Sequence, residues 1–160
     1  MKKKIFSLSI IIILTLIALV GCNNKEIEKE ENLTGELSAI IEKIYENSEL
    51  EDLPMLMNTE LTEDNVNYYL GISELAFKEG LASEPLVGSI PHSVVLIRIN
   101  NLDDKETVKR EIKENVDPYK WICVGVEQKD VIVDSYGDII VLIMSKDSAK
   151  LHEGFKRVIE

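Results

Sequence analysis

Residues 94–99 read VVLIRI, and residues 139–144 read IIVLIM. Apart from Arg98, both stretches are apolar at consecutive positions and not at alternate ones. A strand with one face in water alternates apolar and polar side chains, so these runs predict two strands of one sheet that are buried on both faces. Helices on one side would leave the second face wet. Either two N-terminal helices or a partner must cover that face, and we favour the helices.

The sequence around these strands predicts helices. A first helix has one apolar face at the i, i+3, i+4, i+7 and i+8 spacing, made of Leu37, Ile40, Ile41, Ile44 and Tyr45. Thr62 is the predicted N-cap of a second helix, which ends at Gly71. Asp103 and Glu106 form a predicted capping box for a third helix. A last helix has an inward face made of Leu151, Phe155 and Ile159.

Further strands are expected at residues 80–87, 121–126 and 131–133, the last in a hairpin with 139–144, whereas 75–77 fits helix or strand. Pro85 cannot donate to a ladder, so its strand suits a sheet edge. The prediction is an α+β fold in which an antiparallel sheet is packed with helices, two N-terminal helices being followed by strand–strand–helix units. Two such units echo each other, through internal duplication or because such units are generally alike.

The N-terminus predicts an export signal that ends in a lipidation site. Three lysines at positions 2–4 precede an uncharged, mostly apolar stretch at 5–20, and LVGC at 19–22 resembles the bacterial lipobox. We expect residues 1–21 to be a lipoprotein signal peptide and Cys22 to take up diacylglycerol, which would hold the protein at the outer face of the cytoplasmic membrane. The alternative is an uncleaved anchor, because the uncharged run nearly reaches the roughly 20 residues of a spanning helix. That anchor would also leave the domain outside.

The remaining chain divides into a tether and one domain. Residues 22–32 are polar and charge-dense, so we expect a flexible tether, with an exposed helix as the alternative. Residues 33–160 are long enough for a single globular domain. The chain has 18 Lys plus Arg against 29 Asp plus Glu, and removal of the signal would take away three of the basic residues. Such a surface repels nucleic acid and anionic lipid, so no nucleic-acid partner is expected and the membrane is contacted through the lipid on Cys22.

Two side chains are candidates for catalysis, although no residue is assigned as catalytic. Cys123 lies between Ile122 and Val124, which favours a buried core cysteine over a reactive thiolate. His92 lies at the entrance to the strand at 94–99, where a histidine bonded to the backbone is commoner than a base or ligand. We expect His152 to face solvent.

The sequence predicts neither a metal site nor a cofactor site. His-x₃-His and Cys-x₂-Cys spacings are absent, as are Gly-rich phosphate loops. Asp134 and Asp138 bracket the expected hairpin loop, where turn geometry explains aspartate better than calcium does. Tyr68 and Tyr136 are candidates for an exposed contact with wall sugars, whereas Tyr69 and Trp121 are assigned to the core.

Several segments carry a resemblance to a known family. They are YYLGI at 68–72, ASEP at 82–85, HSVVLIR at 92–98, ENVDP at 114–118, KWICV at 120–124, Asp134, and GD at 137–138. Together with the lipobox, they resemble the family called domain of unknown function 4358 over nearly the whole mature chain. The resemblance implies a small exported lipoprotein of low-GC Gram-positive bacteria. It brings no established activity and no catalytic residues.

These observations favour a non-enzymatic interaction or accessory domain at the cell envelope, with an envelope protein or polymer as its partner. Enzymatic activity stays open. One alternative is a small extracellular enzyme that uses Cys123 or His92. Another is a glycan- or solute-binding lipoprotein.

Overall fold

The computed structural model describes residues 31–160, so the expected signal peptide, Cys22 and most of the expected tether lie outside the described residues. The described elements are α2 (Leu37–Asn47), β1 (Leu56–Glu60), α3 (Val66–Leu70), β2 (Phe77–Pro85), β3 (His92–Ile99), η1 (Leu102–Asp104), α4 (Lys105–Asn115), η2 (Gln128–Asp130), β4 (Val131–Tyr136), β5 (Ile139–Ser145) and α5 (Ser148–Ile159). Within this range, no helix is long and apolar enough to cross a membrane.

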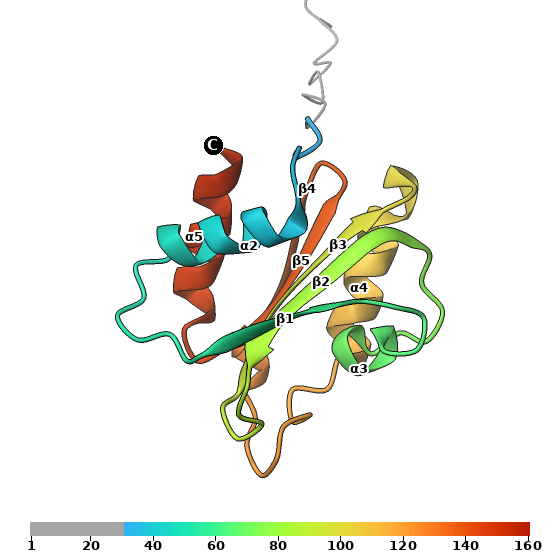
Figure 1. Cartoon of the computed structure of the whole chain (residues 1–160). Helices are drawn as coiled ribbons and strands as arrows, with labels where there is room; N and C mark the ends of the chain where they lie inside the picture. Colours follow the sequence, from blue (N-terminus) through green and yellow to red (C-terminus); the bar gives the residue numbers. More distant parts are fainter. Residues whose placement is uncertain (1–30) are drawn as a thin grey trace, which may run out of the picture.

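The strands form one five-stranded antiparallel sheet in the order β1-β2-β3-β5-β4 (Figure 1). The two strands with unbroken apolar runs, β3 and β5, are neighbours near the centre of this sheet, and Val95 lies opposite Leu142. The predicted α+β fold, an antiparallel sheet packed with helices, is confirmed.

Helices cover both faces of the sheet. Because successive strand residues point to opposite faces, Val94 and Leu96 pack with α2 and α5, whereas Val95 and Ile97 pack with α3 and α4. The two N-terminal helices therefore take different faces, and helices of the same chain cover both sides of β3 and β5 (Figure 1). This arrangement explains the consecutive apolar residues of both strands.

Several local predictions were wrong. β1 was not foreseen, and it makes β2 an internal strand instead of an edge. Pro85 is tolerated there because it is the last residue of β2 and lies beyond the final β2–β3 pair, Ser83 with Val94. The expected strand at 121–126 is an irregular loop. The β4–β5 turn is shorter than expected, since Tyr136 already pairs with Ile139.

The expected helix caps also differ from the structure. Asn65, and not Thr62, is the N-cap of α3, and Gly71 at its C-cap has the positive φ of 73° that glycine tolerates. Near α4, the side chain of Asn101 accepts a hydrogen bond from the Asp103 amide, and no capping box with Glu106 forms. Several short polar side chains near a helix start can serve as its cap, so the sequence predicted where the helices lie more accurately than it predicted their first residues.

The strand–strand–helix units β2-β3-α4 and β4-β5-α5 pack their helices on opposite faces of the sheet. β3 and β5 are antiparallel neighbours, so a two-fold rotation that exchanges them has its axis perpendicular to the sheet. Such a rotation leaves α4 on its own face of the sheet, whereas α5 lies on the other face. The two units therefore cannot be superposed by this rotation. The echo in the sequence is not matched by a symmetry of the fold.

Candidate interaction site

Five exposed apolar side chains gather on two loops at one end of the molecule, and we call them the apolar tip. They are Leu86, Val87, Ile90, Tyr119 and Ile122. The two loops meet where the Ile122 amide donates to the Gly88 carbonyl at 2.9 Å. Ile122 is 72% exposed and Tyr119 is 67% exposed, although both lie on a well-packed domain. Clustered exposure of this kind makes the apolar tip a candidate contact surface.

The apolar tip lies at the opposite end of β3 from the point where the chain enters the domain. The loop with Leu86 and Val87 leads into His92, the first residue of β3, whereas Arg98 near its other end binds the entering chain. The strand has eight residues, which span roughly 25 Å. Figure 1 shows the entering chain at the top and both tip loops at the bottom.

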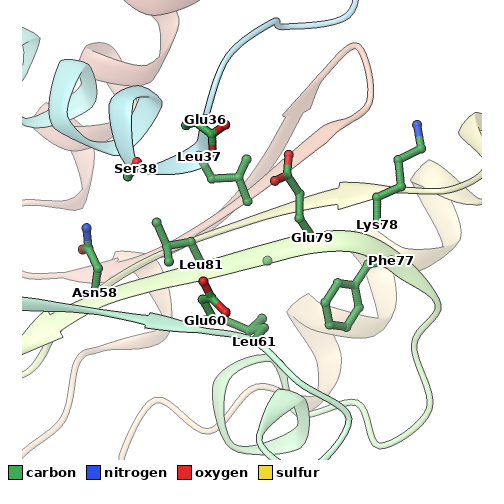
Figure 2. A pocket seen from close by; sticks show the side chains of 11 residues that line it. Glu36, Leu37, Ser38, Asn58, Glu60, Leu61, Phe77, Lys78, Glu79 and Leu81 are labelled. Atoms are coloured by element: carbon green, nitrogen blue, oxygen red, sulfur yellow. The ribbon is translucent and has the colours of Figure 1, made fainter.

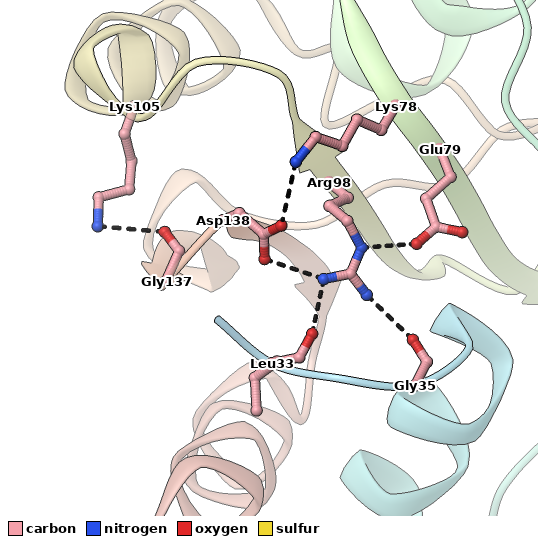
Figure 3. A network of polar contacts seen from close by, with 8 residues as sticks. All are labelled: Leu33, Gly35, Lys78, Glu79, Arg98, Lys105, Gly137 and Asp138. Carbon is pink, nitrogen blue, oxygen red and sulfur yellow. Dashed lines mark hydrogen bonds and ion pairs between the residues drawn. The ribbon is translucent and has the colours of Figure 1, made fainter. Parts of the chain in front are cut away.

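Arg98 fixes the entering chain to the sheet through a polar network (Figure 3). Its guanidinium donates to the carbonyl oxygens of Leu33 at 2.6 Å and Gly35 at 3.0 Å. It also pairs with the carboxylates of Glu79 at 2.6 Å and Asp138 at 2.9 Å. Burial would lower the pKa of Arg98, but these carboxylates raise it, so the side chain stays charged. The single polar residue of the predicted core strand is therefore the anchor of the entering chain.

A second enclosed cation, Lys120, lies behind the apolar tip. Its side chain is 3% exposed, and its Nζ lies 2.6 Å from Oε1 of Glu84. The rings of Tyr68, Tyr69 and Trp121 surround the ammonium, with centroids at 4.7, 4.8 and 5.4 Å. We call these five residues the Lys120 cluster. It joins the loop that holds Tyr119 and Ile122 to α3 and β2.

The Lys120 cluster leaves polar atoms unsatisfied. Burial lowers the pKa of Lys120, and the attraction of Glu84 opposes that shift only in part. Although Nζ and Oε1 are close, neither atom has a hydrogen bond of acceptable geometry. The indole nitrogen of Trp121 is also buried without a partner. Buried polar atoms are normally paired, so this cluster calls for a chemical explanation.

Backbone turns hold the rest of the tip loop. The Tyr119 amide donates to the side chain of Asp117 at 2.8 Å, and the Val126 amide donates to the Pro118 carbonyl at 2.9 Å. Cys123 is exposed and has a positive φ of 61°, so the prediction of a buried core cysteine was wrong. A residue in the left-handed region cannot continue a strand, which is why the apolar letters around Cys123 misled.

His92 is a buried, neutral histidine. Its ring contacts the Tyr45 hydroxyl at 3.1 Å and the Ser145 hydroxyl at 3.1 Å, so the expected bond to the backbone was wrong. Burial disfavours the imidazolium and lowers the pKa of His92 to about 4, and Asp147 opposes the shift weakly. His92 is 5% exposed and Ser145 is 2% exposed, so this Ser–His contact is closed to a substrate. No hydrogen bond joins His92 to Cys123 in the described part of the chain.

The two aspartates of the β4–β5 hairpin have separate partners. Asp134 accepts from His152 at 2.6 Å, which corrects the expectation that His152 simply faces solvent. Burial would raise the pKa of Asp134, but the hydrogen bonds from His152 and the Ser135 amide lower it. Asp138 binds Arg98 instead of joining Asp134. Among residues 31–160, no three His, Cys, Asp or Glu side chains form a group that could hold a metal ion.

The two tyrosine candidates differ in accessibility. Tyr68 is 48% exposed and contacts Lys120, whereas Tyr136 is partly buried against the core formed by α2 and α5. Tyr68 is the half-exposed member of the Lys120 cluster, so it is a better contact residue than Tyr136. Tyr69 and Trp121 pack against the core, as expected.

An open groove of about 400 Å³ lies between the start of α2 and strands β1 and β2 (Figure 2). Its floor includes Leu37 and Leu81, and its rim includes Glu36 and Glu60. Glu79, also on the rim, is already engaged by Arg98. Ser38 and Lys78 also line the groove, and Lys78 is paired with Asp138 at 3.6 Å.

Sequence reasoning missed Glu84, Lys120 and the apolar tip. A signal was present, because three of the family-like segments, YYLGI, ASEP and KWICV, supply the Lys120 cluster. Comparison with protein families, characterised proteins and solved structures finds no match to this chain. The resemblance to the domain of unknown function 4358 family accordingly stays a prediction.

Proposed function

We propose that this chain is a lipid-anchored interaction domain at the outer face of the cytoplasmic membrane, which binds an envelope protein through the apolar tip. The observation that carries the proposal is the position of the tip. It lies at the far end of the domain from Arg98 and the entering chain, so attachment of the chain through lipid on Cys22 would not occupy the tip. The tip would therefore be free to meet a partner while the protein is anchored.

The chemistry of the tip favours a protein partner over a glycan. Four of its five residues are aliphatic and offer no flat ring for stacking: Leu86, Val87, Ile90 and Ile122. Sugars stack on aromatic rings, and Tyr119 is the single aromatic member. The acidic chain further favours a partner whose contact surface is apolar with basic residues at its margin.

Contact residues at the centre of an interface account for most of its binding energy. We therefore expect Ile122→Asp to weaken partner capture by roughly tenfold or more while leaving the melting temperature unchanged, because the side chain is already in water. Leu102→Asp is the matched control, since Leu102 is also exposed but follows the opposite end of β3. The measurement is photo-crosslinking from position 122 or 102 of the full-length lipoprotein in intact cells, followed by affinity measurement with the captured protein.

A specific envelope protein crosslinked from position 122, but not from 102, supports the proposal. Equal labelling from both positions contradicts it, as does turnover of an envelope substrate by the purified protein with no partner captured. Mass spectrometry of the N-terminal peptide tests the anchor separately, because an unmodified Cys22 would remove the membrane from the proposal.

A further inference from the structure

We propose that Lys120 and Glu84 become joined by an amide bond between Nζ and the side-chain carboxyl carbon, which makes the Lys120 cluster a site of covalent self-modification. The inference does not depend on the proposed function. It rests on the close approach of the two groups, on their enclosure and on the polar atoms left unpaired around them.

The reacting groups are held together and shielded from water. Nζ lies 2.6 Å from Oε1, and the two side chains are 3% and 15% exposed. The two groups form a close ion pair, although the atoms approach at an angle that is poor for a hydrogen bond. Because the fold fixes both groups, the reaction is intramolecular and avoids the entropy cost of bringing them together.

Burial of Lys120 favours the reactive form of its side chain. A nucleophilic amine must be neutral, and removal from water disfavours the charged ammonium, although the three ring faces attract the cation. Burial lowers the pKa of Lys120, which is the direction that a nucleophilic amine requires. The rings of Tyr68, Tyr69 and Trp121 leave little room for water to compete.

The step balances without an oxidant or another reactant. The amine attacks the carboxyl carbon, the N–C bond forms, and the C–OH bond breaks. The hydroxyl leaves with one proton from the nitrogen as a water molecule. One positive and one negative charge disappear together, so the net charge of the chain does not change.

The product would reduce the number of buried polar atoms that lack a partner. Within residues 31–160, the buried side-chain nitrogen and oxygen atoms without a partner belong to Glu84, Ser93, Lys120 and Trp121. The β2–β3 register, in which Ser83 pairs with Val94, places Ser93 beside Glu84 on the same face. The amide nitrogen would have one hydrogen in place of three, which leaves fewer buried donors to satisfy, and its carbonyl oxygen is an acceptor on the strand face that Ser93 shares.

The test is a tryptic peptide map of the full-length protein purified from the membrane of the cell that exports it. Without the bond, trypsin releases residues 79–98 and 114–120 as separate peptides. With the bond, cleavage after Lys120 is blocked. The segment 114–129 is then joined to 79–98 in a branched peptide that is lighter than its parts by one water molecule.

Two variants make the result specific. Glu84→Gln can form the same amide by releasing ammonia, so we expect a branched peptide of the same mass as in the wild type. Lys120→Arg retains the charge but cannot form the bond, so we expect complete loss of the branched peptide. Quantitative release of the linear peptides from the folded wild-type protein would overturn the proposal, whatever the outcome of the partner experiments.

Discussion

Each end of β3 encloses a basic side chain, and one of these side chains is charged whereas the other is neutral. Arg98 meets the carboxylates of Glu79 and Asp138, so it remains a cation. His92 meets the hydroxyls of Tyr45 and Ser145, so burial keeps it neutral. A buried charge persists only where opposite charge and hydrogen bonds compensate it. Ion pairs therefore hold Arg98 at the chain-entry end of β3, whereas neutral hydrogen bonds hold His92 at the other end.

Lys120 shows a third arrangement, next to the apolar tip. One carboxylate and three aromatic rings surround it, but a point-like ammonium on a flexible stem cannot be satisfied by a single oxygen. The planar guanidinium of Arg98, by contrast, binds four oxygen acceptors in different directions. The comparison shows that the chain-entry end is complete as a structure, whereas the tip end keeps unpaired polar atoms and exposed apolar side chains. We therefore expect partner binding and side-chain modification at the tip end and not at the chain-entry end.

The largest effect is expected at the chain-entry end. Arg98→Met would leave the buried Asp138 carboxylate with Lys78 at 3.6 Å and would free the carbonyls of Leu33 and Gly35. Breaking a buried ion pair from one side costs about 3–5 kcal/mol, so we expect a loss of that size in the free energy of unfolding. Urea denaturation measures it, with Arg110→Met on the exposed face of α4 as the control. Equal losses in the two variants would mean that the network does not hold the entering chain.

Acid is expected to weaken the other end of β3. The pKa of His92 is about 4 in the folded protein against 6.5 in the unfolded chain. Between these values the unfolded state binds the extra proton, so stability is greatest above pH 6.5 and falls as pH drops toward 4, by up to about 3 kcal/mol. Urea denaturation at a series of pH values measures the slope.

Replacing each histidine in turn shows which of them causes the acid sensitivity of unfolding. His92→Gln removes the titrating group, so we expect most of the slope to disappear, whereas His152→Gln leaves His92 in place and should retain it. Hydrogen exchange in the wild type should rise first at the start of β3. If His92→Gln keeps the full slope, the neutral hydrogen bonds of His92 do not account for the acid sensitivity of this end.

The strands at the centre of the sheet were predictable because consecutive apolar residues indicate burial on both faces. Unbroken apolar runs in β3 and β5 require two dry faces, and the helical spacing of α2 and α5 supplies a cover for one face. β1 was missed because LMNTE has little apolar content, and it forms through its register with β2 and not through burial.

The candidate site was not predictable from local pattern. Lys120 meets its partners only because the fold brings α3, β2 and the loop after α4 together. The apolar tip was hidden for the opposite reason, because Ile122 and Val126 look alike in sequence although one is exposed and the other is buried. No periodicity separates them, since the loop follows its own turns and a positive φ at Cys123.

The smallest effects are expected for substitutions at two glycines in the loops that carry the apolar tip. They test whether these loops are rigid in the free protein. A Cβ at Gly125 would overlap the ring of Tyr119 and the carbonyl oxygen of Pro118. Gly125→Ala should therefore displace the loop and cost about 1–3 kcal/mol, as overpacking usually does. A Cβ at Gly88 would meet Ile122 at an ordinary 3.6 Å, so Gly88→Ala should change stability by less than about 1 kcal/mol.

Thermal denaturation of the two variants, together with hydrogen exchange at the Val126 amide, separates these outcomes. That amide donates to the Pro118 carbonyl, so its protection reports directly on the turn that presents Tyr119. If Gly125→Ala is as mild as Gly88→Ala, the loop yields, and a partner would have to order it on binding. If only Gly125→Ala loses protection, the tip is already shaped in the free protein, and the unpaired polar atoms behind it belong to a rigid part of the fold.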